Sequence, residues 1–66
     1  MNPVSFADAL RGAMDGLTQE QLEEQSGVSQ AMISKYLRGV AKPRLDQLEA
    51  LERALPRLRD LRHAAA

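Results

Sequence analysis

Residues 17–39 read LTQEQLEEQSGVSQAMISKYLRG, and most of the architecture can be inferred from them. Thr18 followed three residues later by Gln21 has the pattern of a capping box, which predicts that a helix begins there. Gly27 can adopt the left-handed conformation that ends a helix. Ser29 is a good N-cap for a second helix, which we expect to stop at Gly39. The stretch therefore predicts two short helices separated by a three-residue turn, residues 27–29.

That turn is too short for the two helices to lie antiparallel. Helices joined in this way cross at a steep angle, as in a helix-turn-helix, and the second helix exposes its outer face. At about 100° per residue, Ile33, Tyr36 and Leu37 share one apolar face. The opposite face is small, polar and basic and consists of Ala31, Ser34, Lys35 and Arg38, with Gln30 at its leading end. These side chains can bond base edges, touch a thymine methyl group or hold phosphates.

A helix is also predicted before this stretch. It begins either at Asn2, with Pro3 in the first helical position, or at Ser5, where Asp8 completes a weak capping box. Gly16 can end it. Because nothing in the chain alternates with period two and strand formers are few, we predict an all-α fold.

The segment after residue 39 predicts one or two further helices. Four leucines form the seam of a fourth helix: Leu45, Leu48, Leu51 and Leu55. Asp46 and Glu49 offer a capping box, although Arg44 or Leu45 is an alternative first residue. Pro56 either breaks the chain or opens a short fifth helix that carries Leu58 and Leu61.

The 66 residues are enough for a single domain, which we place at 1–66 with the helix-turn-helix at 17–39 and a tail at 64–66. There is no Cys, and the single His, His63, lies near the end, so we expect no metal, no cofactor and no catalytic triad. No stretch is apolar enough for a signal peptide or a membrane span. We also expect no small-molecule ligand.

The charges are strongly segregated, although the net charge is zero. Residues 1–26 hold one base against five acids, a net charge of −4, whereas residues 27–45 hold four bases and no acid, a net charge of +4. Such a distribution can steer one face of a protein toward a polyanion. The alternative is that these charges only solvate the surface, and Gln30 could likewise serve only at the start of its helix.

The motif positions strongly resemble the phage-repressor/Cro-like helix-turn-helix family, also called the xenobiotic-response-element type. They are residues 17–22 and 27–30, then Ile33-Ser34-Lys35-Tyr36, Arg38-Gly39 and Pro43, in a gap-free frame over residues 17–55. The resemblance implies a lambda-repressor-like bundle of four to five short helices. It also implies a buried core of Leu22, Val28, Ile33, Tyr36, Leu48, Leu51 and Leu55.

The resemblance further implies the residues that contact double-stranded DNA. Base edges in the major groove would be read by Gln30, Ala31, Ser34 and Lys35. Backbone phosphates would be contacted by Gln19, Ser29, Arg38, Lys42 and Arg44, and Gln19 would also brace Gln30.

Three positions depart from the family pattern. Glu23 and Glu52 stand where small residues are usual, and Arg44 stands where a Ser usually caps the fourth helix. A carboxylate is not buried unpaired without a large penalty. We therefore expect both glutamates to turn to solvent or to pair with a base such as Arg11 or Arg53.

The resemblance implies a sequence-specific transcriptional regulator, without enzyme activity, in a bacterial cytoplasm or a phage-infected host. We expect a Cro-like repressor that binds a palindromic operator as a homodimer through Leu55 and through Leu58 and Leu61 of the C-terminal segment at 56–63. In the rival arrangement, Leu58 folds back on Phe6 and Leu10. Activation by contact with RNA polymerase would use the acidic residues Glu20, Glu23 and Glu24. The alternative function is a protein-interaction module, such as an antitoxin or antirepressor partner.

Overall fold

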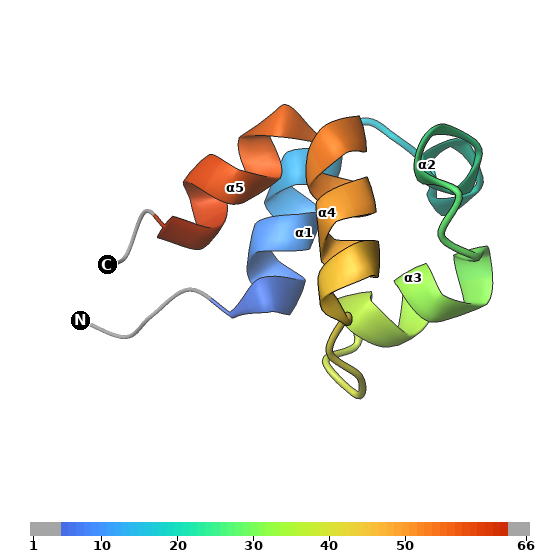
Figure 1. The fold of residues 1–66 in the computed structure, drawn as a ribbon, viewed down its shortest axis with the longest axis horizontal. Coiled ribbons are helices and arrows are strands. Elements are labelled where there is room, and N and C mark those ends of the chain that lie inside the picture. The colour runs from blue at the N-terminus through green and yellow to red at the C-terminus, as the bar shows by residue number, and fades with distance from the viewer. Residues whose placement is uncertain (1–4, 64–66) are drawn as a thin grey trace.

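Five α-helices follow one another in the computed structural model, which describes residues 5–63 (Figure 1). They are α1 (Phe6–Met14), α2 (Gln19–Ser26), α3 (Gln30–Leu37), α4 (Leu45–Ala54) and α5 (Pro56–His63). No strand occurs within the described range, so the prediction of an all-α bundle is confirmed. None of these helices is long and apolar enough to cross a membrane.

The first three helices begin at the residues that the capping pattern predicts. Ser5 accepts a hydrogen bond from the amide of Asp8, and Thr18 forms the full capping box with Gln21. Ser29 caps α3 by accepting from the amide of Met32. The alternative first helix from Asn2 and Pro3 lies outside the described residues.

The fourth helix begins earlier than its predicted capping box. Arg44 is the N-cap residue and makes no side-chain capping bond, so the box of Asp46 and Glu49 is wrong, and the alternative start at Leu45 is confirmed. Asp46 lies inside the first turn instead, where a negative charge interacts favourably with the helix dipole. Pro56 opens α5, as one of the two alternatives predicted.

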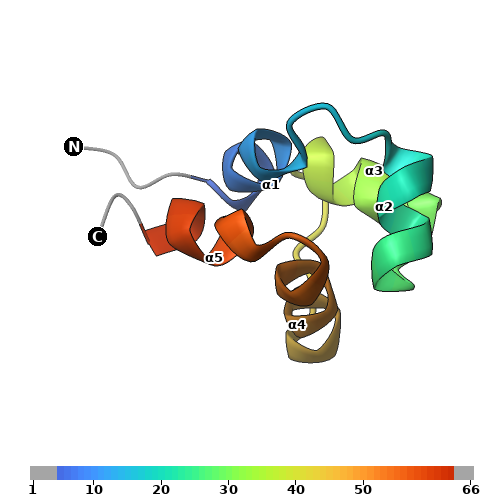
Figure 2. The same ribbon diagram turned by 90° about the horizontal axis from the view of Figure 1, so that it is seen from above.

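The core lies where α1, α3, α4 and α5 meet and is extended by Leu22 and Val28. Helix α1 packs on both α3 and α5, while α2 packs on α3 and α4 (Figures 1 and 2). The rings of Phe6 and Tyr36 meet edge to face with centroids 6.1 Å apart. This geometry is favourable for aromatic pairs. The fully buried large side chains are Leu10, Leu22, Ile33, Tyr36, Leu51 and Leu58.

The predicted leucine seam of α4 is only partly buried. Leu51 and Leu55 belong to the core, Leu48 is half-buried, and Leu45 is 70% exposed. Leucines three residues apart drift around a helix by about 60° per step, so Leu45 lies about 120° from Leu51. One neighbouring surface does not cover so wide an arc, and the prediction that Leu45 is part of the seam is wrong.

The predicted dimer seam also needs correction. Leu55 and Leu58 are 5% and 0% exposed within a single chain, in the core cluster that contains Leu10 and against which Phe6 packs. The rival arrangement, in which Leu58 folds back within one chain, is the one observed. Leu61 is half-buried, and its Cδ1 would lie 3.3 Å from a Cβ added at Gly12 of α1. Leu55 and Leu58 therefore offer no surface to a second copy.

Glu52 is accommodated by an ion pair that joins α4 to α5. Its Oε2 lies 2.9 Å from Nη2 of Arg62, and the two side chains are 20% and 29% exposed. The expected pairing with a base is therefore observed, but the base is Arg62 and not one of the two suggested, Arg11 and Arg53. The prediction missed Arg62 because that residue becomes a neighbour only when α5 folds back along the bundle.

Candidate nucleic-acid interface

Helices α2 and α3 form a helix-turn-helix at one end of the molecule. In Figure 1, α2 is seen almost along its axis while α3 lies across the view, so the two axes cross steeply. Gly27 has φ of 78° and ends α2 in the left-handed conformation, where a side chain would be strained. Val28 is buried and fixes the turn to the core. Ser26 Oγ donates to the carbonyl of Leu22 and accepts from the amide of Val28, which closes the turn.

The two faces of α3 differ as predicted. Ile33 and Tyr36 are buried. Gln30, Ala31 and Lys35 are exposed on the outer side. Ser34 is half-buried. The outer face is therefore available for contact along most of its length, and all of its described side chains are polar or small.

Cations follow this face at the C-terminal end of α3. Arg38 is the C-cap residue, and its Nε donates to the carbonyl of Ser34 at 3.4 Å. Lys42 and Arg44 are exposed in the connection to α4. We call the four exposed cations Lys35, Arg38, Lys42 and Arg44 the basic strip; residues 27–45, from which they come, contain no acid.

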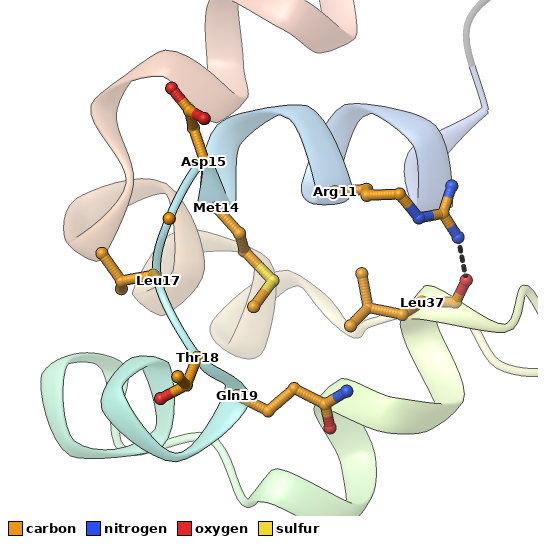
Figure 3. A pocket seen from close by; sticks show the side chains of 8 residues that line it. Arg11, Met14, Asp15, Leu17, Thr18, Gln19 and Leu37 are labelled. Carbon is orange, nitrogen blue, oxygen red and sulfur yellow. Dashed lines mark hydrogen bonds between the residues drawn. The ribbon is translucent and has the colours of Figure 1, made fainter.

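A surface hollow of about 390 Å³ lies beside the basic strip, between the start of α1 and the end of α3. Its lining includes Arg38 and Lys42 and also Arg11 from α1. Arg11 pairs with Asp8 at 3.1 Å. Its Nη2 also donates to the carbonyl of Leu37 at 2.9 Å (Figure 3). A cation at a helix C-terminus interacts favourably with the dipole, so Arg11 also helps to hold α3 in place.

Phosphate contacts were predicted for Ser29 at the start of α3 and for Gln19 at the start of α2. The Ser29 hydroxyl accepts from Met32, which leaves its own proton for an outside acceptor. Gln19 is half-buried and lines a second hollow, of about 340 Å³, with Met14 and Leu37 (Figure 3). No hydrogen bond joins Gln19 to Gln30 among the described residues, so the predicted brace between them is not observed.

Gln30 is contacted by Glu23 instead. The Oε2 atom of Glu23 accepts a hydrogen bond from the backbone amide of Gln30 at 3.1 Å. We expected solvent or a basic side chain around this glutamate, and the structure corrects that expectation. A carboxylate at a helix N-terminus is stabilised by the dipole. The two ends of α3 are thus held by opposite charges, from Glu23 in α2 and from Arg11 in α1.

A further contact fixes α3 against α4. The Tyr36 hydroxyl donates to Oε1 of Gln47, a residue that the sequence did not single out. Burial raises the pKa of Tyr36 above its ordinary value of 10.0, and the negative charge of Asp46 adds to this while Arg44 opposes it. At neutral pH the hydroxyl therefore stays protonated and able to donate.

The described residues contain no group of three or more His, Cys, Asp or Glu side chains that could hold a metal ion. The single histidine, His63, is exposed at the end of α5. Polar residues on an exposed helix face and a strip of cations suit contact with a large anionic surface.

Comparison with protein families identifies a match that includes this whole interface. A family model described as helix-turn-helix matches residues 9–60, which include α2, the turn, α3 and every residue predicted to contact DNA. No curated protein and no solved structure matches the chain significantly.

Proposed function

The chain belongs to the phage-repressor/Cro-like helix-turn-helix family of DNA-binding regulators, and we propose that it reads a specific double-stranded DNA site through the outer face of α3. The major groove of B-DNA admits an α-helix and presents a distinct pattern of donors and acceptors for each base pair. Gln30 and Lys35 supply hydrogen-bonding groups for this pattern, Ala31 suits a thymine methyl group, and Ser34 lies between them on the same face.

One observation carries this proposal: the outer face of α3 is mostly exposed and contributes no acidic side chain of its own, while the inner face is packed into the core. A helix used only for structure needs no such exclusion of acids from residues 27–45. Acidic side chains would be repelled by the DNA phosphates, whereas Lys and Arg neutralise the phosphates and release the counterions bound to the DNA. The pattern is thus the one that binding to a polyanionic duplex requires.

Phosphate contacts are proposed for residues around this face. Arg38, Lys42 and Arg44 extend the basic strip beyond α3 and suit the backbone on one side of the groove. Ser29 has a hydroxyl proton to offer at the start of α3, and Gln19 lies at the start of α2. These contacts would set register and orientation, while the four residues on α3 would set the sequence.

We also propose that two copies act together on a palindromic operator and that the outcome is repression. A single small module gives limited discrimination against competing genomic sites. Two copies related by a two-fold axis would place their α3 helices about 34–36 Å apart. Repression requires only that the promoter is occupied. For activation, Glu20 and Glu24 remain exposed on α2 as a surface that RNA polymerase could contact.

This function can be tested by selecting preferred duplexes from a random pool. The affinities of Lys35→Ala and Arg38→Ala are then measured on the selected duplex and on a scrambled one. Lys35→Ala should cost about 1–3 kcal/mol on the selected site and relax the preference at particular base pairs. Arg38→Ala should weaken both duplexes alike. Failure of the pool to yield any preferred site, or equal losses for Lys35→Ala on both duplexes, would contradict base readout by α3.

A further inference from the structure

The N-terminus of α3 is already occupied by oxygen atoms of the protein. Glu23 Oε2 accepts from the amide of Gln30 at 3.1 Å, and the Ser29 hydroxyl accepts from the amide of Met32 at 3.2 Å. The first amides of a helix point out of its N-terminus and carry partial positive charge, which is why such ends bind phosphate. In this chain a carboxylate has taken the place that a phosphate could otherwise fill.

A phosphate oxygen and Glu23 compete for the same donor. The amide of Gln30 has one proton, so a phosphate oxygen at bonding distance would have to displace Glu23 Oε2. The carboxylate is only partly buried, and its negative charge also repels a phosphate that approaches this end of the helix. At the opposite end of α3, Arg38 and Lys42 line the hollow beside the helix, where Arg11 is already paired with Asp8.

Resting on the DNA-binding function proposed above, we infer that Glu23 lowers the affinity of this protein for DNA by excluding phosphate from the amide of Gln30, the first residue of α3. At this end of α3 only the hydroxyl proton of Ser29 is then left for a phosphate, and most of the backbone contact falls to the cations at the C-terminal end of α3 and in the connection to α4. Glu23 has a structural role as well, since its hydrogen bond to Gln30 ties α2 to the start of α3.

Three variants separate these effects. Glu23→Gln removes the charge and keeps a side-chain oxygen that can accept from Gln30. Glu23→Ala removes both the charge and the acceptor. Glu24→Gln is the matched control, because Glu24 is the exposed next residue in α2 and its substitution changes the net charge of the same helix equally. Binding of each is measured on the duplex selected by the wild-type protein and on a scrambled duplex, across a series of salt concentrations.

Glu23→Gln should bind both duplexes about threefold more tightly per half-site than Glu24→Gln. This is the size of the repulsion that the variant removes, if the Glu23 carboxylate and a phosphate are treated as two like unit charges roughly 6 Å apart in water. Glu23→Ala also frees the amide of Gln30. Because a helix N-terminus carries roughly half a unit charge, this variant should steepen the log–log salt slope by about 0.5 per half-site.

Equal affinities for Glu23→Gln and Glu24→Gln would overturn the inference, as would weaker binding by Glu23→Gln with unchanged helicity in circular dichroism. If Glu23→Ala does not fold, Glu23→Gln alone decides the result. A wild-type protein that binds no duplex at all would overturn the proposed function itself, and the inference with it. That outcome is distinct from a wild-type protein that binds while the Glu23 variants behave like the control.

Discussion

The salt dependence of DNA binding should report directly on the basic strip. Arg38, Lys42 and Arg44 are exposed, and in the proposed binding mode each half-site would place these three cations near phosphates. Two half-sites then neutralise roughly six phosphates, and at roughly 0.9 per phosphate the log–log slope of affinity against salt should be about −5. Fluorescence anisotropy with a labelled duplex across a salt series measures this slope.

Removal of two of these cations should change the slope by a calculable amount. The double variant Lys42→Ala/Arg44→Ala leaves roughly two phosphate contacts for two half-sites, so its slope should fall to about −2. The matched control is Arg53→Ala/Arg59→Ala, which removes the same charge from exposed positions on α4 and α5. The control should keep a slope of about −5, since screening by salt limits the reach of distant exposed charges.

The reasoning is refuted if both double variants flatten the slope equally. Net charge, rather than contact by the basic strip, would then govern binding. A slope near zero for the wild-type protein would show that the segregated charges do not serve DNA binding at all.

Two further predictions concern stability. Leu58→Ala should destabilise the chain by about 2–5 kcal/mol, because it leaves a cavity at a fully buried site. Urea unfolding followed by circular dichroism measures this loss of stability. A loss below about 1 kcal/mol, together with loss of a dimer, would instead assign Leu58 to a dimer interface. Tyr36→Phe should cost about 1 kcal/mol at neutral pH through the lost bond to Gln47. Because the pKa of Tyr36 is raised in the folded state, the contribution of its hydroxyl to folding stability is complete below pH 10.0, the ordinary pKa, and is lost as the pH rises through the folded pKa. Tyr36→Phe should therefore lose less stability than the wild-type protein over this alkaline range. An identical loss of stability in both proteins would argue against this role of Tyr36.

Local signals predicted much of the architecture, because they depend on residues close together in the chain. The N-caps at Ser5, Thr18 and Ser29 each satisfy an amide three residues ahead, so the sequence contains both partners of the bond. The left-handed turn at Gly27 is equally local. The apolar face of α3 followed from helical periodicity alone, and Ile33 and Tyr36 are buried as predicted.

Contacts between helices could not be predicted in the same way. Arg11 reaches the carbonyl of Leu37 and Arg62 reaches Glu52, and no short pattern links either pair. Glu23 is closer in sequence to its partner Gln30, but whether it can accept a hydrogen bond from that amide depends on the angle at which α2 and α3 cross. The exposure of Leu45 likewise depends on which arc of α4 the other helices cover. The roles of the outer-face residues in DNA contact stay predictions that the experiments above address.

The separation of the two faces of α3 has a consequence for how this protein could change its target. Ile33 and Tyr36 hold the helix in the core, whereas Gln30, Ala31 and Lys35 are exposed on the other side. Surface substitutions away from buried contacts usually alter stability by less than about 0.5 kcal/mol. A library randomised at those three exposed positions should therefore consist mostly of folded proteins, so that new operators can be acquired, by evolution or by engineering, without compensating changes in the interior.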